Sequence, residues 1–330
     1  MRPSPRPARV PCPPARPTPT KSRGSWPTAS STSSTRLTSS TRTERVAESG
    51  LVVIDKPAGI TSHDVVARVR RALGTRKVGH AGTLDPMATG VLVLGVERAT
   101  RLLGHLMLTE KTYSATVRLG QTTTTDDAEG EVVATTTAAD VAEGDVRSAL
   151  ASFEGEIEQV PSTVSAIKVN GKRAYALARD GEQVELKARP VTIHEIAVGE
   201  LQRVGDLLDV EIRVRCSSGT YIRAIARDLG AALGVGGHLT ALRRHSVGAF
   251  TLDGANTDFE HLTLTPLADA ARSTFPAVEL DAEQAQAVRY GRPLPLTLDD
   301  LTGLFDPAGE FLALYRPEGG VARPAAVFVG

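Results

Sequence analysis

The sequence predicts an α+β fold that is built on a mixed, largely antiparallel sheet with flanking helices. Segments with the short apolar or alternating patterns of strands outnumber segments with helical periodicity. The helical segments are spaced irregularly, without the regular βαβ alternation that builds a parallel sheet. A chain of 330 residues is long enough for about two domains. We therefore expect a main α+β domain that is followed by a small β-rich domain.

The first predicted elements are a strand and a helix that follow one another closely. Apolar residues at 51–54 predict a short buried strand. Thr61 begins the helix, because Asp64 three residues later completes a capping box. The helix has one apolar face, formed by Val65, Val66, Val69 and Leu73.

The later elements follow from the same criteria. In chain order, we expect a buried strand at 91–96, a helix at 101–108, an alternating strand at 113–119, a helix at 140–153, a hairpin at Asn170-Gly171, paired strands at 191–204 and 207–215, a helix at 220–233 and a strand at 247–252. Residues 253–277 are acidic and loop-rich, which places a domain boundary near residue 275. The main domain then covers 49–275, and the small domain covers 276–330 with strands at 311–315 and 325–329.

Residues 1–48 differ in composition from the rest of the chain. They hold nine basic and two acidic residues, nine of the twenty prolines, and Ser/Thr runs such as 30–34. Such a segment has too little apolar surface to offset the entropy of ordering, so we expect it to be disordered. Its Arg- and Ser-rich composition resembles an organelle transit peptide. The alternative that we favour is a non-functional extension from a misassigned start codon.

The net charge of zero conceals an uneven distribution. The extension carries a net +7 and the remainder a net −7. Within the remainder, 51–115 and 216–250 are basic, whereas 116–215 and 251–330 are acidic. If the two basic stretches meet in the fold, they form a positive cleft suited to nucleic acid.

Several classes of protein are excluded by what the sequence lacks. Two cysteines cannot form a disulfide framework, and no apolar run reaches the roughly 18–20 residues of a membrane helix. There is no GxxxxGK[ST] loop, no GxGxxG after a strand, no HExxH and no GxSxG elbow. We therefore expect chemistry that uses side chains alone, with no metal and no cofactor.

The segment Gly79-His80-Ala81-Gly82-Thr83-Leu84-Asp85-Pro86-Met87-Ala88-Thr89-Gly90 is the strongest candidate for a site. Its glycines allow the backbone to approach a ligand closely. Pro86 restricts Asp85 to an extended conformation. On composition alone, an ordinary Gly-rich turn with Asp85 as a cap is the favoured interpretation of this segment.

This segment resembles the GHxGxLDPxAxG signature of the TruB-type tRNA pseudouridine-55 synthases of bacteria, especially actinobacteria. The other motifs of that family follow in order over about 50–250. They are Asp55-Lys56-Pro57-x-Gly59-x-Thr61-Ser62, Glu110-Lys111-x-Tyr113, Thr125-Asp126-Asp127-x-Glu129-Gly130, Gln159-x-Pro161-Ser162, Ser165-Ala166-x-Lys168-x-x-Gly171, Cys216-Ser217-x-Gly219-Thr220-Tyr221-Ile222-Arg223 and Leu242-Arg243-Arg244. The resemblance implies a pseudouridine-synthase-like fold. It also implies isomerisation of uridine to pseudouridine at position 55 in the T-loop of tRNA, without a cofactor.

The resemblance implies three catalytic residues. Asp85 matches the family's catalytic aspartate, which either attacks the sugar or acts as a base toward it. Arg223 matches an arginine whose permanent charge opposes the rise in carboxyl pKa that burial causes. Tyr113 matches a tyrosine that stacks on the uracil. Its help in removing the C5 proton is a further hypothesis, because a tyrosine pKa near 10 makes a poor base.

The remaining site residues are implied to bind RNA. The target base must leave its stack, and His80 then fills the vacated space or stacks on the loop. Leu242 contacts the base, and Tyr221 is either a wall of the pocket or part of the core. Lys56 and Pro57 belong to the first motif. The implied phosphate contacts are Lys56, Arg68, Arg70, Arg71, Arg76, Lys77, Lys168, Lys172, Arg173, Arg243 and Arg244.

The end of the chain departs from the family pattern. Bacterial members often end in a small RNA-binding PUA-type domain, whereas 276–330 is short and shows no clear PUA pattern, so we expect a reduced PUA-like domain. We expect a cytoplasmic monomer that binds the T-arm of tRNA, with no membrane contact and no obligate protein partner. Two alternatives are a non-catalytic tRNA-binding or tRNA-folding module and a related synthase that acts on another RNA.

Overall fold

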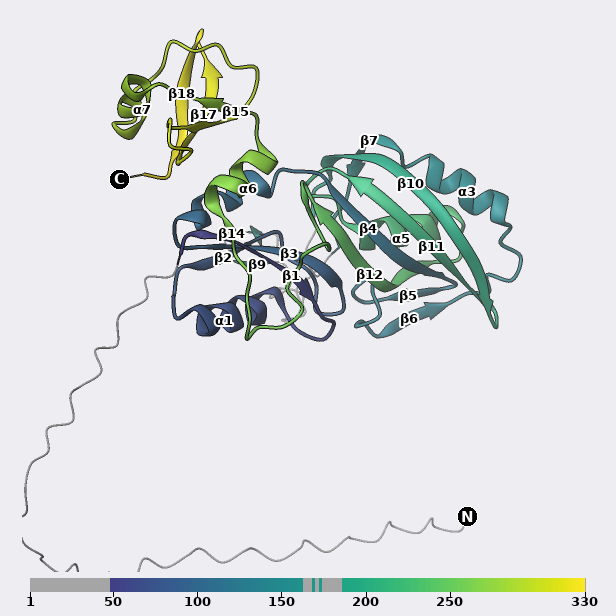
Figure 1. Cartoon of the computed structure of the whole chain (residues 1–330). Helices are drawn as coiled ribbons and strands as arrows, with labels where there is room; N and C mark the ends of the chain where they lie inside the picture. The colour runs from purple at the N-terminus through teal and green to yellow at the C-terminus, as the bar shows by residue number, and fades with distance from the viewer. Residues whose placement is uncertain (1–47, 163–167, 170–171, 174–185, 330) are drawn as a thin grey trace, which may run out of the picture. The chain divides into compact units, whose positions relative to one another are not determined.

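The computed structural model describes residues 48–162, 168–169, 172–173 and 186–329 (Figure 1). The predicted disorder of 1–48 lies outside these residues, apart from residue 48, as does the predicted turn at Asn170-Gly171. Strands β8 (Lys168–Val169) and β9 (Lys172–Arg173) border that turn and pair antiparallel.

The main architectural unit is a ten-stranded sheet. Its strands lie in the order β14 (Thr265–Pro266), β1 (Gly50–Lys56), β3 (Thr89–Val96), β12 (Gly237–Val247), β4 (Lys111–Leu119), β11 (Leu207–Cys216), β10 (Arg189–Val204) and β7 (Gly155–Gln159), with β13 (Phe250–Thr251) on β12 and β2 (Val78–Ala81) on β3. Within the described part of this sheet, β3 and β12 form the one parallel pair. The predicted α+β class with a largely antiparallel sheet is confirmed.

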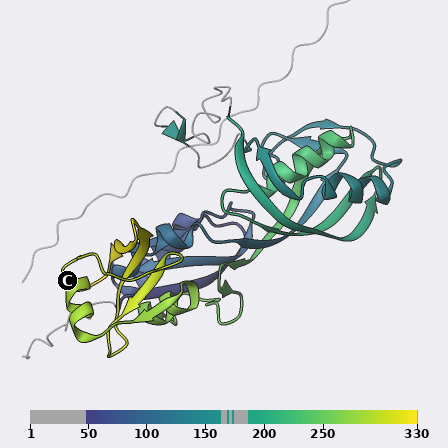
Figure 2. The ribbon, with the colours of Figure 1, turned by 90° about the horizontal axis from the view of Figure 1, so that it is seen from above.

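Helices border the sheet at several points. They are α1 (Ser62–Leu73), the 3₁₀ helix η1 (Glu97–Arg101), α2 (Leu103–Leu106), α3 (Glu143–Ala151), α5 (Ile222–Ala232) and α6 (Leu267–Thr274), whereas α7 (Ala282–Arg289) packs on the C-terminal strands described below. Helix α5 packs on β4 and β12, and α3 packs on α5 and β10 (Figure 2). None of the helices in the described part of the chain has the length and apolar character needed to traverse a lipid bilayer.

Helix α1 begins as its sequence predicts. The Asp64 amide donates to Thr61 Oγ1 over 3.1 Å, and the Thr61 amide donates to Asp64 Oδ2 over 2.9 Å, which completes the capping box. The helix ends at Gly74, whose φ of 66° is the left-handed conformation that glycine adopts at little cost. Val65, Val66 and Val69 are buried against the sheet's main apolar cluster.

The central strand β12 was not predicted. The expected strand at 247–252 corresponds only to the end of β12 and to β13. Residues 237–247 carry two histidines and two arginines, and buried charge at Arg244 breaks the apolar alternation that identifies a strand. The helix expected at 101–108 is also divided between η1 and the short α2, and α3 is shorter than the expected 140–153.

A second sheet follows near the C-terminal end. It contains β15 (Ala277–Glu279), β16 (Thr302–Phe305), β17 (Phe311–Glu318) and β18 (Val321–Val327), and α7 packs on β17 and β18. One buried cluster includes Phe305, Phe311 and Phe328 together with Leu51 and Val93. A two-stranded ribbon of β5 (Gln121–Thr123) and β6 (Val132–Thr135) completes the described strands. The division of the chain at residue 275 stays a prediction.

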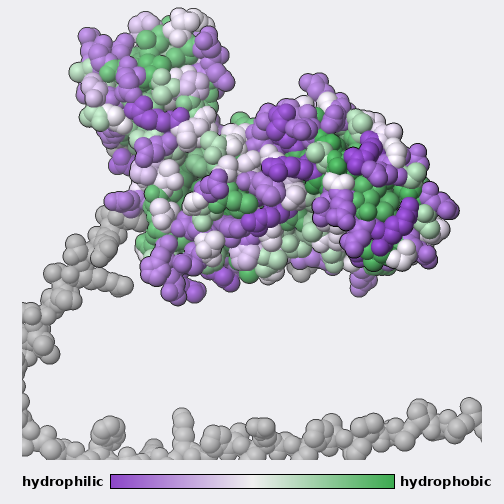
Figure 3. All heavy atoms as spheres, turned by 45° about the vertical axis from the view of Figure 1, so that its right-hand side comes forward, coloured by the Kyte–Doolittle hydropathy of each residue, from purple (hydrophilic) through white to green (hydrophobic). Residues whose placement is uncertain are grey.

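The surface in Figure 3 mixes hydrophilic side chains with scattered apolar patches. Such scattered patches are ordinary for a folded protein, because polar atoms cannot cover its whole surface. A functional site must therefore be identified from the chemistry of its side chains.

Candidate functional site

Asp85 lies in the segment that connects β2 to β3. The Leu84 amide donates to Ser62 Oγ over 2.9 Å, and that hydroxyl donates to the Leu84 carbonyl over 3.1 Å. The Pro86 carbonyl accepts from the Gly59 amide over 2.8 Å. The segment is therefore fixed to the start of α1 on both sides of Asp85.

The structure explains why the motif has glycine at residue 90. A Cβ atom at this position would lie 2.1 Å from the Arg244 carbonyl oxygen, and the φ of Gly90 is 101°. The close approach of β3 to β12 thus requires glycine at residue 90. This contact holds the end of the Asp85 segment against the centre of the sheet.

Lys56 stabilises the Asp85 segment through hydrogen bonds to backbone carbonyls. Its side chain is fully buried, and Nζ donates to the carbonyls of Pro57, Ile60 and Pro86 over 2.9, 2.8 and 3.1 Å. Burial lowers the pKa of Lys56 to about 8, although Asp85 opposes this shift. The predicted phosphate contact of Lys56 is wrong, because an ammonium with these partners and no exposed surface does not reach RNA. Pro57 itself is exposed.

Arg244 has a similar structural role on the other side of the segment. It is 1% exposed, and its guanidinium donates to the carbonyls of Val91 and Gly82 over 2.7 and 3.1 Å. Arg244 also borders the cavity that contains Asp85, so its predicted phosphate contact stays a prediction. The Lys56 error arises because a sequence shows a cation but not the backbone carbonyls that fold around it.

Arg223 connects two carboxylates at the centre of the site. Its Nε lies 3.1 Å from Asp85 Oδ2, and its Nη2 donates to Asp85 Oδ1 over 3.3 Å. Its Nη1 lies 3.3 Å from Asp127 Oδ2 and donates to the Thr125 carbonyl over 2.9 Å. The guanidinium is thus held in one orientation by four oxygen atoms, and it presents a fixed fork to Asp85.

The environment of Asp85 suits a reactive carboxylate. Its side chain is 34% exposed, toward the cavity, whereas those of Arg223 and Asp127 are 5% and 3% exposed. Burial raises the pKa of Asp85, and the positive charge of Arg223 opposes that rise. Arg223 therefore helps to keep a partly desolvated carboxyl ionised.

A cavity of about 270 Å³ opens in front of Asp85. Its wall includes five side chains that the sequence predicted for the site, namely Asp85, Tyr113, Tyr221, Arg223 and Leu242. Arg244 and the unpredicted Met107 and Lys111 also border it. Segments that are far apart in the sequence thus meet at one place, which is where a substrate group would lie.

Tyr113 projects from β4 into this cavity. It is 7% exposed, and burial raises the pKa of its hydroxyl, with Arg244 opposing the rise. Leu242 on β12 is 8% exposed. The Tyr221 backbone is fixed by Gln159, whose side-chain amide accepts from the Tyr221 amide over 2.8 Å and donates to its carbonyl over 3.1 Å. The aromatic ring and the leucine provide apolar surface of the kind that a flat base requires.

Among the described residues, the remaining predicted RNA contacts lie outside the cavity. His80 on β2 is half-buried, with its ring edge-to-face on His63 at 5.6 Å between centroids. Arg243 is bound by Asp55 over 2.7 and 3.1 Å but remains 37% exposed. The side chains of Lys168, Lys172 and Arg173 lie outside the described residues. The exposed cations on α1 and just after it are Arg68, Arg70, Arg71, Arg76 and Lys77.

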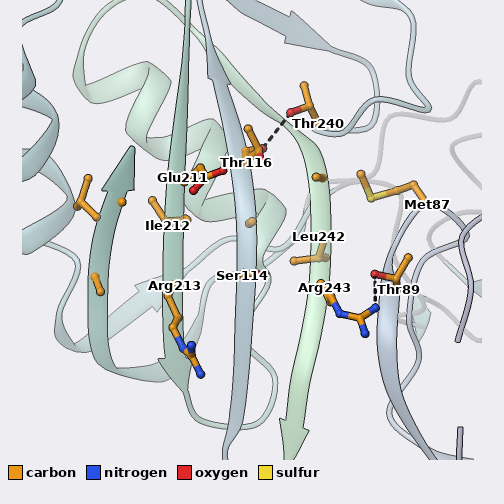
Figure 4. A pocket seen from close by; sticks show the side chains of 15 residues that line it. Met87, Thr89, Ser114, Thr116, Glu211, Ile212, Arg213, Thr240, Leu242 and Arg243 are labelled. Atoms are coloured by element: carbon orange, nitrogen blue, oxygen red, sulfur yellow. Dashed lines mark hydrogen bonds between the residues drawn. The ribbon is translucent and has the colours of Figure 1, made fainter. Parts of the chain in front are cut away.

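A second cavity, of about 560 Å³, lies across β10, β11, β4 and β12 (Figure 4). Figure 4 shows Thr240 bonded to Thr116 and Arg243 bonded to Thr89 at its wall. It shares Leu242 with the first cavity, but it contains neither Asp85 nor Arg223. The Asp85–Arg223 pair therefore belongs to the smaller cavity.

Sequence reasoning missed the role of Asp127. It was visible only as a member of the Thr125-Asp126-Asp127 motif, with nothing to show that its carboxylate reaches Arg223. Its own position is fixed, because the Glu129 amide donates to Asp127 Oδ1 over 3.1 Å. Asp127 thus orients Arg223 from the side opposite Asp85.

Replacing Lys56 by methionine tests its structural role. Three partly buried carbonyls lose their donor, so we expect the free energy of unfolding to fall by about 2–4 kcal/mol in a urea titration. The salt dependence of RNA binding by the folded variant should not change. The matched control is Arg76→Met at an exposed position, which should leave stability unchanged and reduce the salt slope by about 1. A stable Lys56→Met variant with a reduced salt slope would instead show that Lys56 contacts a phosphate.

Comparison with protein families agrees with this geometry. The chain matches the model of the TruB family pseudouridylate synthase N-terminal domain over 70–222. It matches the tRNA pseudouridylate synthase B C-terminal domain over 223–282 and the tRNA pseudouridine synthase II C-terminal model over 275–329. Together these matches cover the cavity and the second sheet.

Individual relatives are similar over most of their length. The chain is 57% identical to a tRNA pseudouridine synthase B of Arthrobacter sp. over 295 residues, which is 85% of this chain and 96% of the relative. It is 56% identical to the protein of that name from Thermobifida fusca, covering 85% and 99%. Among solved structures, a Cbf5-Nop10-Gar1 complex contains a chain with 28% identity and a TM-score of 0.63, and the match covers 85% of both chains.

Proposed function

Because this chain belongs to the TruB family of pseudouridine synthases, we propose that it isomerises uridine 55 in the T-loop of tRNA to pseudouridine by means of Asp85. Its similarity to enzymes named tRNA pseudouridine synthase B over 85% of the chain supports this substrate. The observation that carries the catalytic assignment is the pairing of Asp85 with the buried Arg223 at the floor of a cavity. A protein that only bound tRNA would have no use for a partly desolvated carboxylate there.

The reaction breaks the bond between N1 of uracil and C1′ of ribose and forms one between C5 and C1′. Asp85 starts glycosidic cleavage as an ionised carboxylate, either by attack on the sugar or as a base toward it. Arg223 maintains that ionised state and fixes the direction of the carboxylate. The base rotates between Tyr113 and Leu242 and loses its C5 proton when the new bond is complete. The isomerisation needs no oxidant or reductant, so we propose a reaction without a cofactor.

The target uridine must leave its stack, because a catalytic side chain cannot reach a base that is stacked inside a folded RNA loop. The cavity of about 270 Å³ in front of Asp85 is where the extruded base would lie. The exposed cations of α1 then contact phosphates, and His80 stacks on the RNA loop. We propose that Arg243 and Lys168 contact phosphates of the same RNA.

The proposed enzyme acts as a monomer in the cytoplasm, where its substrate is present, without an obligate protein partner. The support for this is that Asp85, Tyr113 and Arg223 all come from one chain, so the cavity needs no residue from a second one.

The function is tested with a T-arm stem–loop RNA that carries C5-tritiated uridine. We expect the full chain to release tritium stoichiometrically from position 55 and to form pseudouridine there, as mapped by mass spectrometry. Binding of the RNA without release of tritium would contradict the proposal and favour the tRNA-binding alternative. Release only from another RNA would favour the related-synthase alternative.

Tyr113→Phe separates the two roles of this side chain. The phenyl ring retains the stacking surface, so we expect the Kd for RNA to remain within about twofold. The rate of tritium release should fall about 10²-fold, because the phenol oxygen no longer receives the C5 proton. The raised pKa of Tyr113 keeps most of its hydroxyl protonated, so the proton acceptor is the small phenolate fraction, which the nearby Arg244 charge favours. A phenylalanine variant with full tritium release would exclude the proton-transfer role.

A further inference from the structure

Two exposed apolar residues lie beside the mouth of the catalytic cavity. Met107 and Leu108 follow α2, and they are 45% and 75% exposed. Met107 also borders the cavity that contains Asp85. An exposed leucine alone needs no explanation, but here an apolar pair is continuous with the wall of the catalytic cavity.

The structure fixes the backbone under this pair. The buried ammonium of Lys111 donates to the carbonyls of Met107 and Thr109 over 2.9 and 2.6 Å. Thr109 Oγ1 donates to the Leu106 carbonyl over 2.8 Å. The Met107 amide continues the helical pattern by donating to Leu103 over 3.0 Å. The exposed side chains are thus presented from a segment that is already ordered, so binding to them costs little backbone entropy.

The chemistry of this segment favours a base over a phosphate. Residues 102–109 carry no Lys or Arg, and the charged residue that follows them is Glu110. Lys111 is 6% exposed and occupied by the two carbonyls. Residues 102–109 themselves therefore offer a phosphate no lysine or arginine, whereas an apolar surface suits the face of an unstacked base.

We propose that Met107 and Leu108 form an apolar platform for the nucleobase that adjoins the extruded uridine. This inference rests on the proposed function, since extrusion of the uridine exposes a face of its neighbour. Apolar side chains such as Leu and Met pack against bases that have lost a stacking partner. The platform therefore replaces part of the stacking energy that extrusion costs.

The test is a substitution series at Leu108, which does not border the cavity. The probe is a T-arm stem–loop with 2-aminopurine on either side of the target uridine, in separate RNAs. We expect Leu108→Ser to weaken binding about fivefold and Leu108→Phe to strengthen it about threefold. The fluorescence change of 2-aminopurine on one side should shrink in the first variant and grow in the second. The single-turnover rate of tritium release at saturating enzyme should change much less than the Kd.

The matched control is the pair Val132 and Val133 on β6, which are 55% and 65% exposed. Neither borders the cavity, so Val133→Ser should leave Kd and fluorescence unchanged. Equal Kd values across the Leu108 series, or equal losses in the Val133 control, would overturn the platform. Tritium release by the unsubstituted chain tests the proposed function separately, so the two failures are distinguishable.

Discussion

Asp85→Asn is expected to reduce pseudouridine formation by about 10⁴-fold or more, with tRNA binding unchanged within about threefold. The amide is nearly isosteric, but it has no negative charge with which to attack the sugar or accept a proton. Since Arg223 remains held by Asp127 and the Thr125 carbonyl, the shape of the cavity should persist. The measurements are tritium release under single-turnover conditions and a filter-binding titration with the same RNA.

A matched control exists elsewhere on the sheet. Asp209 also forms a two-point pair with an arginine, accepting from Arg118 over 2.7 Å at both oxygens. It borders neither cavity, so Asp209→Asn should keep nearly full activity. If Asp85→Asn retained more than about a tenth of the activity, Asp85 would not be the reacting group.

Arg223→Lys is the second substitution with a large expected effect. A lysine ammonium cannot form the two-point contact with Asp85 while also reaching Asp127, so the carboxylate loses its fixed direction. We expect the maximal rate to fall about 10²–10³-fold. Arg118→Lys, in the half-buried pair with Asp209, is the matched control and should change the rate little.

A pH profile of the rate separates the effect of Arg223→Lys on the Asp85 carboxylate from a simple loss of structure. Burial raises the pKa of Asp85, and Arg223 is the main group that lowers it. With a weaker counter-charge the pKa of Asp85 rises further, so more of the carboxyl is protonated at a given pH. The acid limb of the rate profile should therefore move to higher pH in Arg223→Lys. An unchanged profile with a lower rate would indicate that Arg223 acts only on the fold.

Removal of the positive charge of Arg223 should also lower the free energy of unfolding. In Arg223→Met, Asp127 becomes a buried carboxylate without its counter-charge, which costs about 3–5 kcal/mol in comparable sites. The lysine variant is therefore the better probe of catalysis.

The parts of the fold that depend on local pattern were predictable. The capping box at Thr61 and Asp64 located the start of α1, and alternation located β4. Strand β12 was missed because two arginines and two histidines interrupt its pattern. The arginine charges are accommodated by partners from other strands, such as Asp55 for Arg243, and no local pattern contains that information.

The site was predictable in its residues but not in its geometry. Motif resemblance selected Asp85, Tyr113 and Arg223, and the structure places all three around one cavity. The same resemblance treated Lys56 as an RNA contact, although it is buried against carbonyls. Whether a cation faces solvent depends on tertiary packing, which a linear motif does not specify.

The place of β12 in the sheet has a consequence for synthesis on the ribosome. Residues 237–247 are inserted between β3 and β4, which end at residues 96 and 119. Until β12 has emerged, the nascent chain holds two long strands whose inner edges lack their final partner. Unpaired edges of this kind favour aggregation, and pairings over such sequence distances form slowly. The enzyme therefore becomes catalytically competent late in translation, and a chaperone that shields these edges would raise its yield.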